Sequence, residues 1–190
     1  MINVAVEGES DREMACALIR HAGQVPGTVR VARGKSRLDP KIAKYRQAAR
    51  SVSWLVLRDS DGACPVELVQ RLDPAHGEAS RRFAVRVVHG MTEAWLMGDR
   101  EGFGAFFGVS PAVVPADPEN LHHAKQTLLA VCAKSSSRHI REGMVARHGK
   151  EGPLYVALVN EFASQSWDVG VAAERAPSLA RAIRAVRDLL

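Results

Sequence analysis

Four carboxylates of this sequence stand at or just after the ends of short apolar runs, where they could bind a divalent cation. They are Glu7, Asp59, Asp61 and Glu93, and the runs before them span 2–6, 54–57 and 83–88. Parallel strands bring their carboxyl ends to one edge of a sheet, so these acids would meet there and repel one another unless a cation neutralised them. Oxygen ligands of this kind suit Mg²⁺ or Mn²⁺. The sequence therefore predicts a divalent-metal site at that edge.

Asp59 and Asp61 form the most constrained pair of the set. Residues two apart in an extended strand share a face, and Gly62 allows the chain to turn directly afterwards. Asp-Ser-Asp-Gly is by itself a common turn sequence, and Glu93 also suits the first turn of a helix, where the dipole favours acids. The metal prediction thus depends on acids recurring at several strand ends.

Other catalytic signatures are incomplete. Gly34-Lys35-Ser36 resembles the end of a P-loop, but Val29 stands where its first glycine belongs. The three cysteines, Cys16, Cys64 and Cys132, are widely spaced and form no Cys-x-x-Cys pair. This argues against a disulfide framework and a cysteine zinc site, and it predicts a reducing cytoplasm.

The composition is that of a soluble globular protein. The chain has 190 residues, of which 46% are hydrophobic and 25% charged, enough for one domain with a smaller appendage. No run approaches the roughly 18 apolar residues of a membrane helix, and the N-terminus lacks the basic flank and long apolar run of a signal peptide. We therefore expect a cytoplasmic protein without a membrane partner.

Positive charge is unevenly distributed along the chain. The net charge is +5, and the stretch 30–50 holds eight basic residues against one acid. Clustered positive charge suits nucleic acid, because phosphate contacts supply most non-specific binding. The predicted phosphate contacts are Arg33, Lys35, Arg37, Lys41 and Lys44. A second basic stretch spans 134–150, and for both stretches a solvated helix face remains the alternative.

Strand-like and helix-like segments alternate in the first half, which predicts an α/β fold with a mostly parallel sheet flanked by helices. We expect strands at 2–6, 28–31, 54–57 and 83–88, and helices at 10–21, 39–50, 65–72 and 92–97. Ser10 and Asp39 are the predicted N-caps of the first two helices. After about Val109 we expect only helices, at 121–134, 137–146, 154–163 and 178–190. The predicted division is a metal-binding domain, 1–109, and a helical C-terminal extension, 110–190.

Three blocks of this sequence together resemble a known family. They are Val6-Glu7-Gly8-Glu9-Ser10-Asp11, Leu57-Arg58-Asp59-Ser60-Asp61-Gly62 and Thr92-Glu93-Ala94-Trp95-Leu96-Met97-Gly98-Asp99. They resemble the signature blocks of the DUF4276 family, small proteins with a Toprim-like fold related to the nuclease half of the overcoming-lysogenization-defect (OLD) nucleases. Ala176-Pro177-Ser178-Leu179 also resembles that family's C-terminal segment. The resemblance implies a Toprim-like sheet with flanking helices.

The resemblance also implies roles for the acids. Glu7 would serve as general acid/base or metal ligand, and Asp59 and Asp61 would hold the metal. Asp11 would join a second metal, although the family more often has the longer Glu at this position. Because Mg²⁺ demands short, near-octahedral contacts, we expect one tight site at Glu7, Asp59 and Asp61, and a weaker second site near Asp11.

Two further residues and a partner follow from the same resemblance. Glu93 matches the acid of the family's Glu-Ala-Trp block, and Lys125 is the candidate lysine for contact with the transition state. Similar genes stand beside ATPase genes in phage-defence clusters, which implies an ATPase partner.

The predicted function is Mg²⁺-dependent cleavage of phosphodiester bonds in DNA or RNA. One alternative is a non-catalytic Toprim-like module that binds nucleic acid or a partner protein. Another is a phosphatase or nucleotidyl transferase that acts on a small substrate.

Overall fold

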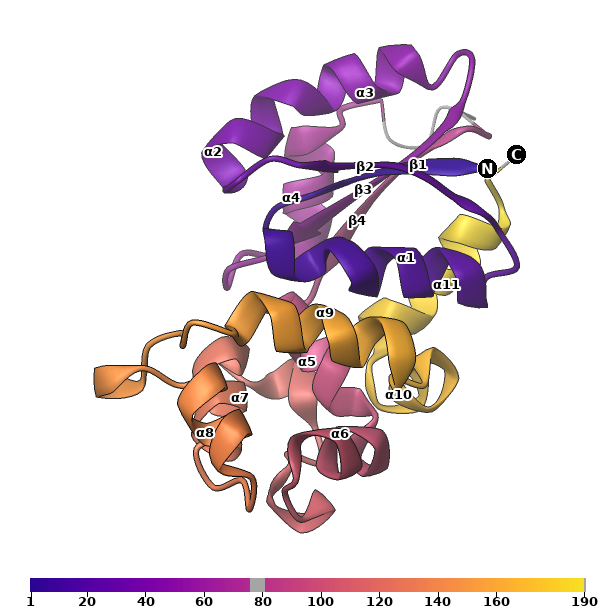
Figure 1. Ribbon diagram of the computed structural model, residues 1–190. Helices are drawn as coiled ribbons and strands as arrows, with labels where there is room; N and C mark the ends of the chain where they lie inside the picture. The colour runs from indigo at the N-terminus through magenta and orange to yellow at the C-terminus, as the bar shows by residue number, and fades with distance from the viewer. Residues whose placement is uncertain (76–80, 190) are drawn as a thin grey trace.

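The computed structural model describes residues 1–75 and 81–189, which contain one four-stranded parallel sheet (Figure 1). Its strand order is β2-β1-β3-β4, and all three pairings are parallel. The strands are β1 (Ile2–Val6), β2 (Pro26–Val31), β3 (Ser53–Asp59) and β4 (Phe83–Val88). The predicted α/β class and parallel sheet are confirmed.

Helices cover both faces of the sheet, which explains why its strands are apolar runs and not alternating ones. Val4 and Leu55 belong to a large core shared with α1 (Arg12–His21) and α11 (Pro177–Arg187). Their chain neighbours Ala5 and Val56 point to the opposite face and belong to a smaller core with Leu38 and Ile42. That smaller core lies beneath α2 (Lys35–Leu38) and α3 (Ile42–Ala48) (Figure 1).

The remaining helices mostly gather below the sheet in Figure 1 and share the large core. They are α5 (Thr92–Gly98), α6 (Arg100–Phe107), α7 (Ala124–Cys132), α8 (Arg138–Met144), α9 (Tyr155–Gln165) and α10 (Val169–Arg175). Helix α4 (Pro65–Leu72) packs against β4.

The predicted division at 109/110 stays a prediction, although the large core draws residues from both sides of it. In the described ranges no helix is long and apolar enough to span a bilayer.

Two predicted helix starts are wrong. Ser10 lies within a 3₁₀ turn, Glu9–Asp11, and it is the Asp11 carboxylate that accepts the Gly8 N–H, at 2.7 Å. Asp39 does not begin a helix, because α2 already starts at Lys35 and continues into a 3₁₀ turn, Asp39–Lys41. The Ser10 hydroxyl donates only to the neighbouring Asp11 carboxylate, and the Asp39 carboxylate accepts from Arg58 instead of capping a helix.

Candidate functional site

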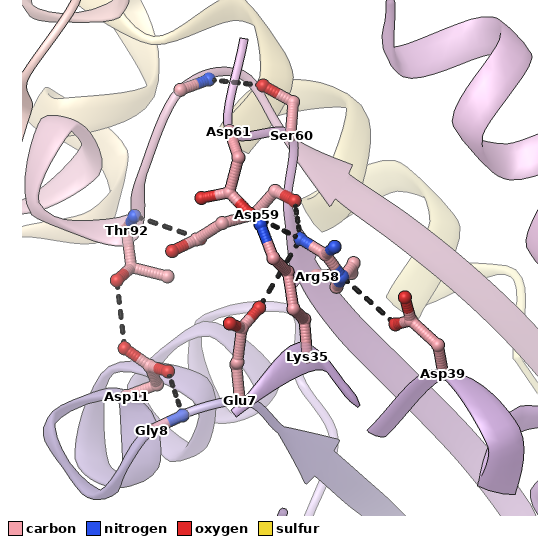
Figure 2. A network of polar contacts seen from close by, with 11 residues as sticks. Glu7, Gly8, Asp11, Lys35, Asp39, Arg58, Asp59, Ser60, Asp61 and Thr92 are labelled. Atoms are coloured by element: carbon pink, nitrogen blue, oxygen red, sulfur yellow. Dashed lines mark hydrogen bonds and ion pairs between the residues drawn. The ribbon is translucent and has the colours of Figure 1, made fainter. Parts of the chain in front are cut away.

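The carboxyl ends of β1 and β3 form the topological switch point of the sheet, where open α/β sheets have their binding crevice. The chain leaves β1 toward β2 on one side and returns on the other side as β3, so the connections diverge at this point. Open α/β sheets bind ligands at such switch points. Glu7 directly follows β1 and Asp59 ends β3, and Figure 2 shows their carboxylates facing that of Asp11.

Asp59 lies at the centre of this acid cluster. Its Oδ1 accepts the backbone N–H of Thr92, the first residue of α5, at 3.2 Å. Burial raises the pKa of Asp59 well above its usual value, and four neighbouring negative charges raise it further. These neighbours are Asp11, Glu93, Glu7 and Asp61. The five predicted acids are thus close enough to interact electrostatically.

Asp11 is held between two elements. Its Oδ2 accepts the Gly8 N–H, and its Oδ1 accepts the Thr92 hydroxyl at 2.8 Å. The side chain is buried, and this burial raises the pKa of Asp11 despite both hydrogen bonds. Thr92 therefore joins Asp11 to Asp59, since its hydroxyl serves one acid and its backbone N–H the other.

Asp61 is more strongly paired than the other acids. The strand ends at Asp59, and Asp61 has a left-handed φ of 48°, so the extended geometry predicted for the pair is wrong. Its Oδ2 accepts from Lys35 at 2.9 Å and from Arg58 at 3.1 Å. Burial would raise the pKa of Asp61, but these two cations lower it below its usual value.

Arg58 organises the acids, and sequence reasoning missed it. Its guanidinium is buried and contacts three carboxylates as well as the backbone carbonyl of Asp59. The carboxylates are those of Asp39 at 3.0 Å, Asp61 at 3.1 Å and Glu7 at 3.4 Å (Figure 2). The sequence did contain a signal for this role, since Arg58 is the next-to-last residue of a buried strand. A buried charge rarely lacks partners.

Two carboxylate oxygens in this region lack a hydrogen-bond partner. They are Oε2 of Glu7 and Oε2 of Glu93, and both are buried. Arg58 approaches Glu7 Oε2 as an ion pair, and burial raises the pKa of Glu7. Buried oxygens of this kind are rare and often mark the position of a water or an ion.

Glu93 connects the site to the helices below the sheet. Its Oε1 accepts the Tyr155 hydroxyl at 2.6 Å and lies 3.4 Å from the ammonium of Lys125. Lys125 also pairs with Glu151 at 3.0 Å. Burial would lower the pKa of Lys125, but these two acids raise it, so the lysine stays charged. The structure therefore places Lys125 at the cluster, together with Tyr155, which nothing in the sequence singled out.

The predicted phosphate contacts lie in the segment 33–44, which runs from just before α2 through a 3₁₀ turn into α3. Arg33, Lys35, Arg37, Lys41 and Lys44 are all exposed. Lys35 alone reaches the acid cluster, through its ion pair with Asp61. Arg46 of the same stretch instead binds the buried Asp73 with two hydrogen bonds.

The carboxylate oxygens of the acid cluster are ligands of the kind that a hard divalent cation prefers. Within residues 1–75 and 81–189, no three His, Cys, Asp or Glu side chains stand close enough together to hold a metal ion. Magnesium, however, is usually bound through one or two protein carboxylates, and water and substrate phosphates complete its shell. Glu7 and Asp59 at the switch point, with a buried Glu7 oxygen that accepts no hydrogen bond, match that pattern of carboxylate donors.

Comparisons with known proteins give one partial match. Over 86 residues the chain is 34% identical to a release factor glutamine methyltransferase of Bordetella pertussis (strain Tohama I). The match covers 45% of this chain and 28% of that protein. No family model and no solved structure matches the chain. The resemblance to the DUF4276 family therefore stays a prediction from the sequence.

Proposed function

We propose that this chain is a Mg²⁺-dependent nuclease that hydrolyses phosphodiester bonds at the carboxyl edge of its sheet. One observation carries the proposal: four acids, of which Asp11 and Glu93 are buried, converge on Asp59 at the switch point and raise its pKa. Such a cluster carries unfavourable negative charge that a divalent cation would relieve. The buried oxygens of Glu7 and Glu93 that accept no hydrogen bond support the same conclusion.

Each residue of the cluster has a chemical task in this proposal. Glu7 and Asp59 would hold the Mg²⁺, which when bound polarises a phosphoryl group and helps to stabilise the attacking and leaving oxygens. If Glu7 does not bind the metal directly, its raised pKa suits it instead to carry a proton as general acid or base. Lys125 keeps a positive charge beside Glu93, where it would stabilise charge on the phosphoryl oxygens. Arg58 positions Glu7 and Asp61.

The substrate assignment rests on the exposed basic residues that begin next to these acids. The Gly34 N–H donates to the carbonyl of Glu7, so the start of α2 adjoins the crevice. Arg37, Lys41 and Lys44 follow on the exposed sides of α2 and α3, where they would contact the backbone without reading the bases. An ATPase partner and a role in phage defence, implied by the resemblance, belong to the same proposal.

An assay on plasmid DNA and on RNA tests this function. Wild type should cleave at least one of them with Mg²⁺ or Mn²⁺ and neither with EDTA. Asp59→Asn should reduce the rate by at least about 100-fold, the upper end of the losses seen when groups supporting a metal are removed. Glu161→Gln, on the exposed side of α9, removes one charge elsewhere and should cleave like wild type.

Three outcomes would contradict the proposal in different ways. Cleavage that survives EDTA, or an Asp59→Asn variant that cleaves as fast as wild type, would show that the acids take no part in the reaction. Tight binding without cleavage by wild type would favour the non-catalytic module. Transfer of a methyl group to a glutamine, the activity named for the partial match, would replace hydrolysis altogether.

A further inference from the structure

Two arginines lie at the outer edge of the sheet, away from the acid cluster. Arg86 is on β4, the edge strand, and Arg181 is on α11, which packs against it. Within residues 1–75 and 81–189, the Nε of Arg86 is buried without a hydrogen-bond partner, and neither arginine forms an ion pair with a carboxylate. Arg181 is exposed, and Asp188 is close enough to Arg86 to affect its pKa. An anion would supply the partner that the buried Nε lacks.

A cavity of about 510 Å³ separates these arginines from α4. Its lining combines the polar side chains of Arg86, Arg181 and His89 with the apolar side chains of Pro65, Val66 and Val69. Val66 is 65% exposed, which is unusual for a large apolar residue. Burial lowers the pKa of Arg86 and the charge of Arg181 lowers it further, although Asp188 opposes this. The cavity therefore suits a ligand with an anionic group and an apolar body.

Two further hollows lie between this cavity and Asp61, and each shares lining residues with the next. His89 lines both the arginine cavity and the next hollow. Gly90 and His122 line that second hollow and a third, whose wall includes Asp61. Asp59 pairs with Val88, two residues beyond Arg86 on β4. At about 3.3 Å per strand residue, Arg86 therefore lies roughly 7 Å back along the sheet from the level of Asp59. A few nucleotides would span that separation, since neighbours on a stacked strand are about 3.4 Å apart along the axis.

We propose that this cavity binds one nucleotide of the substrate strand, a few nucleotides from the bond that is cleaved. The phosphate would lie between Arg86 and Arg181, and the base would lie against Pro65, Val66 and Val69. The identification of the ligand as a nucleic-acid strand rests on the proposed nuclease function. The site itself rests on the buried Nε of Arg86, which lacks a hydrogen-bond partner among the described residues, and on the cavity.

Binding without cleavage tests this site separately from the chemistry. The probe is a fluorescent single-stranded 12-mer, titrated by anisotropy in EDTA at several salt concentrations. Arg181→Gln should weaken binding roughly fivefold, the loss expected for a charged hydrogen bond at an exposed position. It should also lower the salt slope by about 0.7, because the variant neutralises one phosphate fewer on a single strand. Val66→Glu, which places a negative charge in the cavity, should weaken binding at least as much.

Arg187→Gln is the matched control, since it removes the same charge from an exposed position of the same helix without altering the cavity. It should bind like wild type. Equal binding by wild type, Arg181→Gln and Val66→Glu would overturn the site while leaving nuclease activity unaffected. Conversely, an effect of both variants on binding would stand even if Asp59→Asn cleaved normally and the proposed function failed.

Discussion

Asp59 is the residue at which burial and like charge act together. Burial raises its pKa, and four other acids raise it further. Without a cation this arrangement opposes folding at neutral pH, because the folded state binds a proton at Asp59 more tightly than the unfolded chain does. This arrangement lies at the topological switch point of the sheet. Strongly shifted pKa values cluster at functional sites, so the position supports a functional role for Asp59.

Asp59→Asn should therefore stabilise the metal-free protein. Metal-free wild type should lose stability as the pH rises above about 4, the pKa of an unfolded aspartate. The loss is complete once the pH exceeds the raised pKa of Asp59 in the folded state. Asn keeps an oxygen to accept from Thr92 without the charge, so at pH 7 the free energy of unfolding should rise by about 1–3 kcal/mol. Urea denaturation in EDTA from pH 4 to 8 measures this. A variant less stable than wild type at pH 7 would contradict it.

Arg58 has the opposite effect on stability from Asp59, because its buried positive charge pairs with three of the acids. Arg58→Gln leaves the carboxylates of Glu7, Asp39 and Asp61 without that partner. Breaking a buried ion pair on one side costs about 3–5 kcal/mol, and partial exposure of the three acids places the expected loss near the lower end. Urea denaturation checks this against Arg12→Gln, which removes an exposed ion pair. A loss below about 1 kcal/mol would show that Arg58 does not organise the cluster.

Helices α2 and α3 present the basic face on which the nucleic-acid assignment depends. Lys41 and Lys44 are exposed and lie on a segment that starts at the crevice. The double variant Lys41→Gln/Lys44→Gln should lower the salt slope of duplex DNA binding by about 1.8, or 0.9 for each phosphate that is no longer neutralised. Arg20→Gln/Arg187→Gln removes the same charge from exposed positions outside both basic stretches and should leave the slope near wild type. Equal slopes for the two double variants would indicate a merely solvated face.

The elements that the sequence predicted best have local signals at both ends. Pro65 at the first helical position and the apolar run Phe83–Val88 gave the bounds of α4 and β4 as the structure has them.

Helices α6 and α10 were not predicted from the sequence. Helix α6 holds two glycines, which disfavour helix, and is stabilised by tertiary packing of Phe103 and Phe107 and by Asp99, whose carboxylate accepts the Gly102 N–H.

The same limit applies to the site. The acids could be predicted because parallel strands deliver their ends to one edge, and that rule needs only strand positions. The partners of these acids could not be predicted, because they act between segments far apart in the sequence. Thr92 bonds to acids 33 and 81 residues away, Tyr155 bonds to one 62 residues away, and Arg58 joins acids from three separate segments. Only the folded chain brings those groups together.

At the scale of the whole molecule, the sheet and the lower helices meet at the acid cluster. Helix α5 follows β4 and supplies Thr92 and Glu93, and Glu93 is bound by Lys125 of α7 and Tyr155 of α9. The site is therefore built from both parts of the chain. A cation bound there would stabilise the packing of the helices as well as the crevice, since anything that binds the folded state adds to its stability.

A crystal grown with Mn²⁺ and measured for anomalous scattering tests the central claim most directly. The account predicts one strong peak in contact with Glu7 and Asp59, near Asp61, and a weak or absent neighbour near Asp11, whose oxygens already accept from Gly8 and Thr92. Asp59→Asn crystals treated in the same way should lose the strong peak. No peak in the crevice, or a single peak away from Glu7 and Asp59, would contradict the metal site and the function proposed from it.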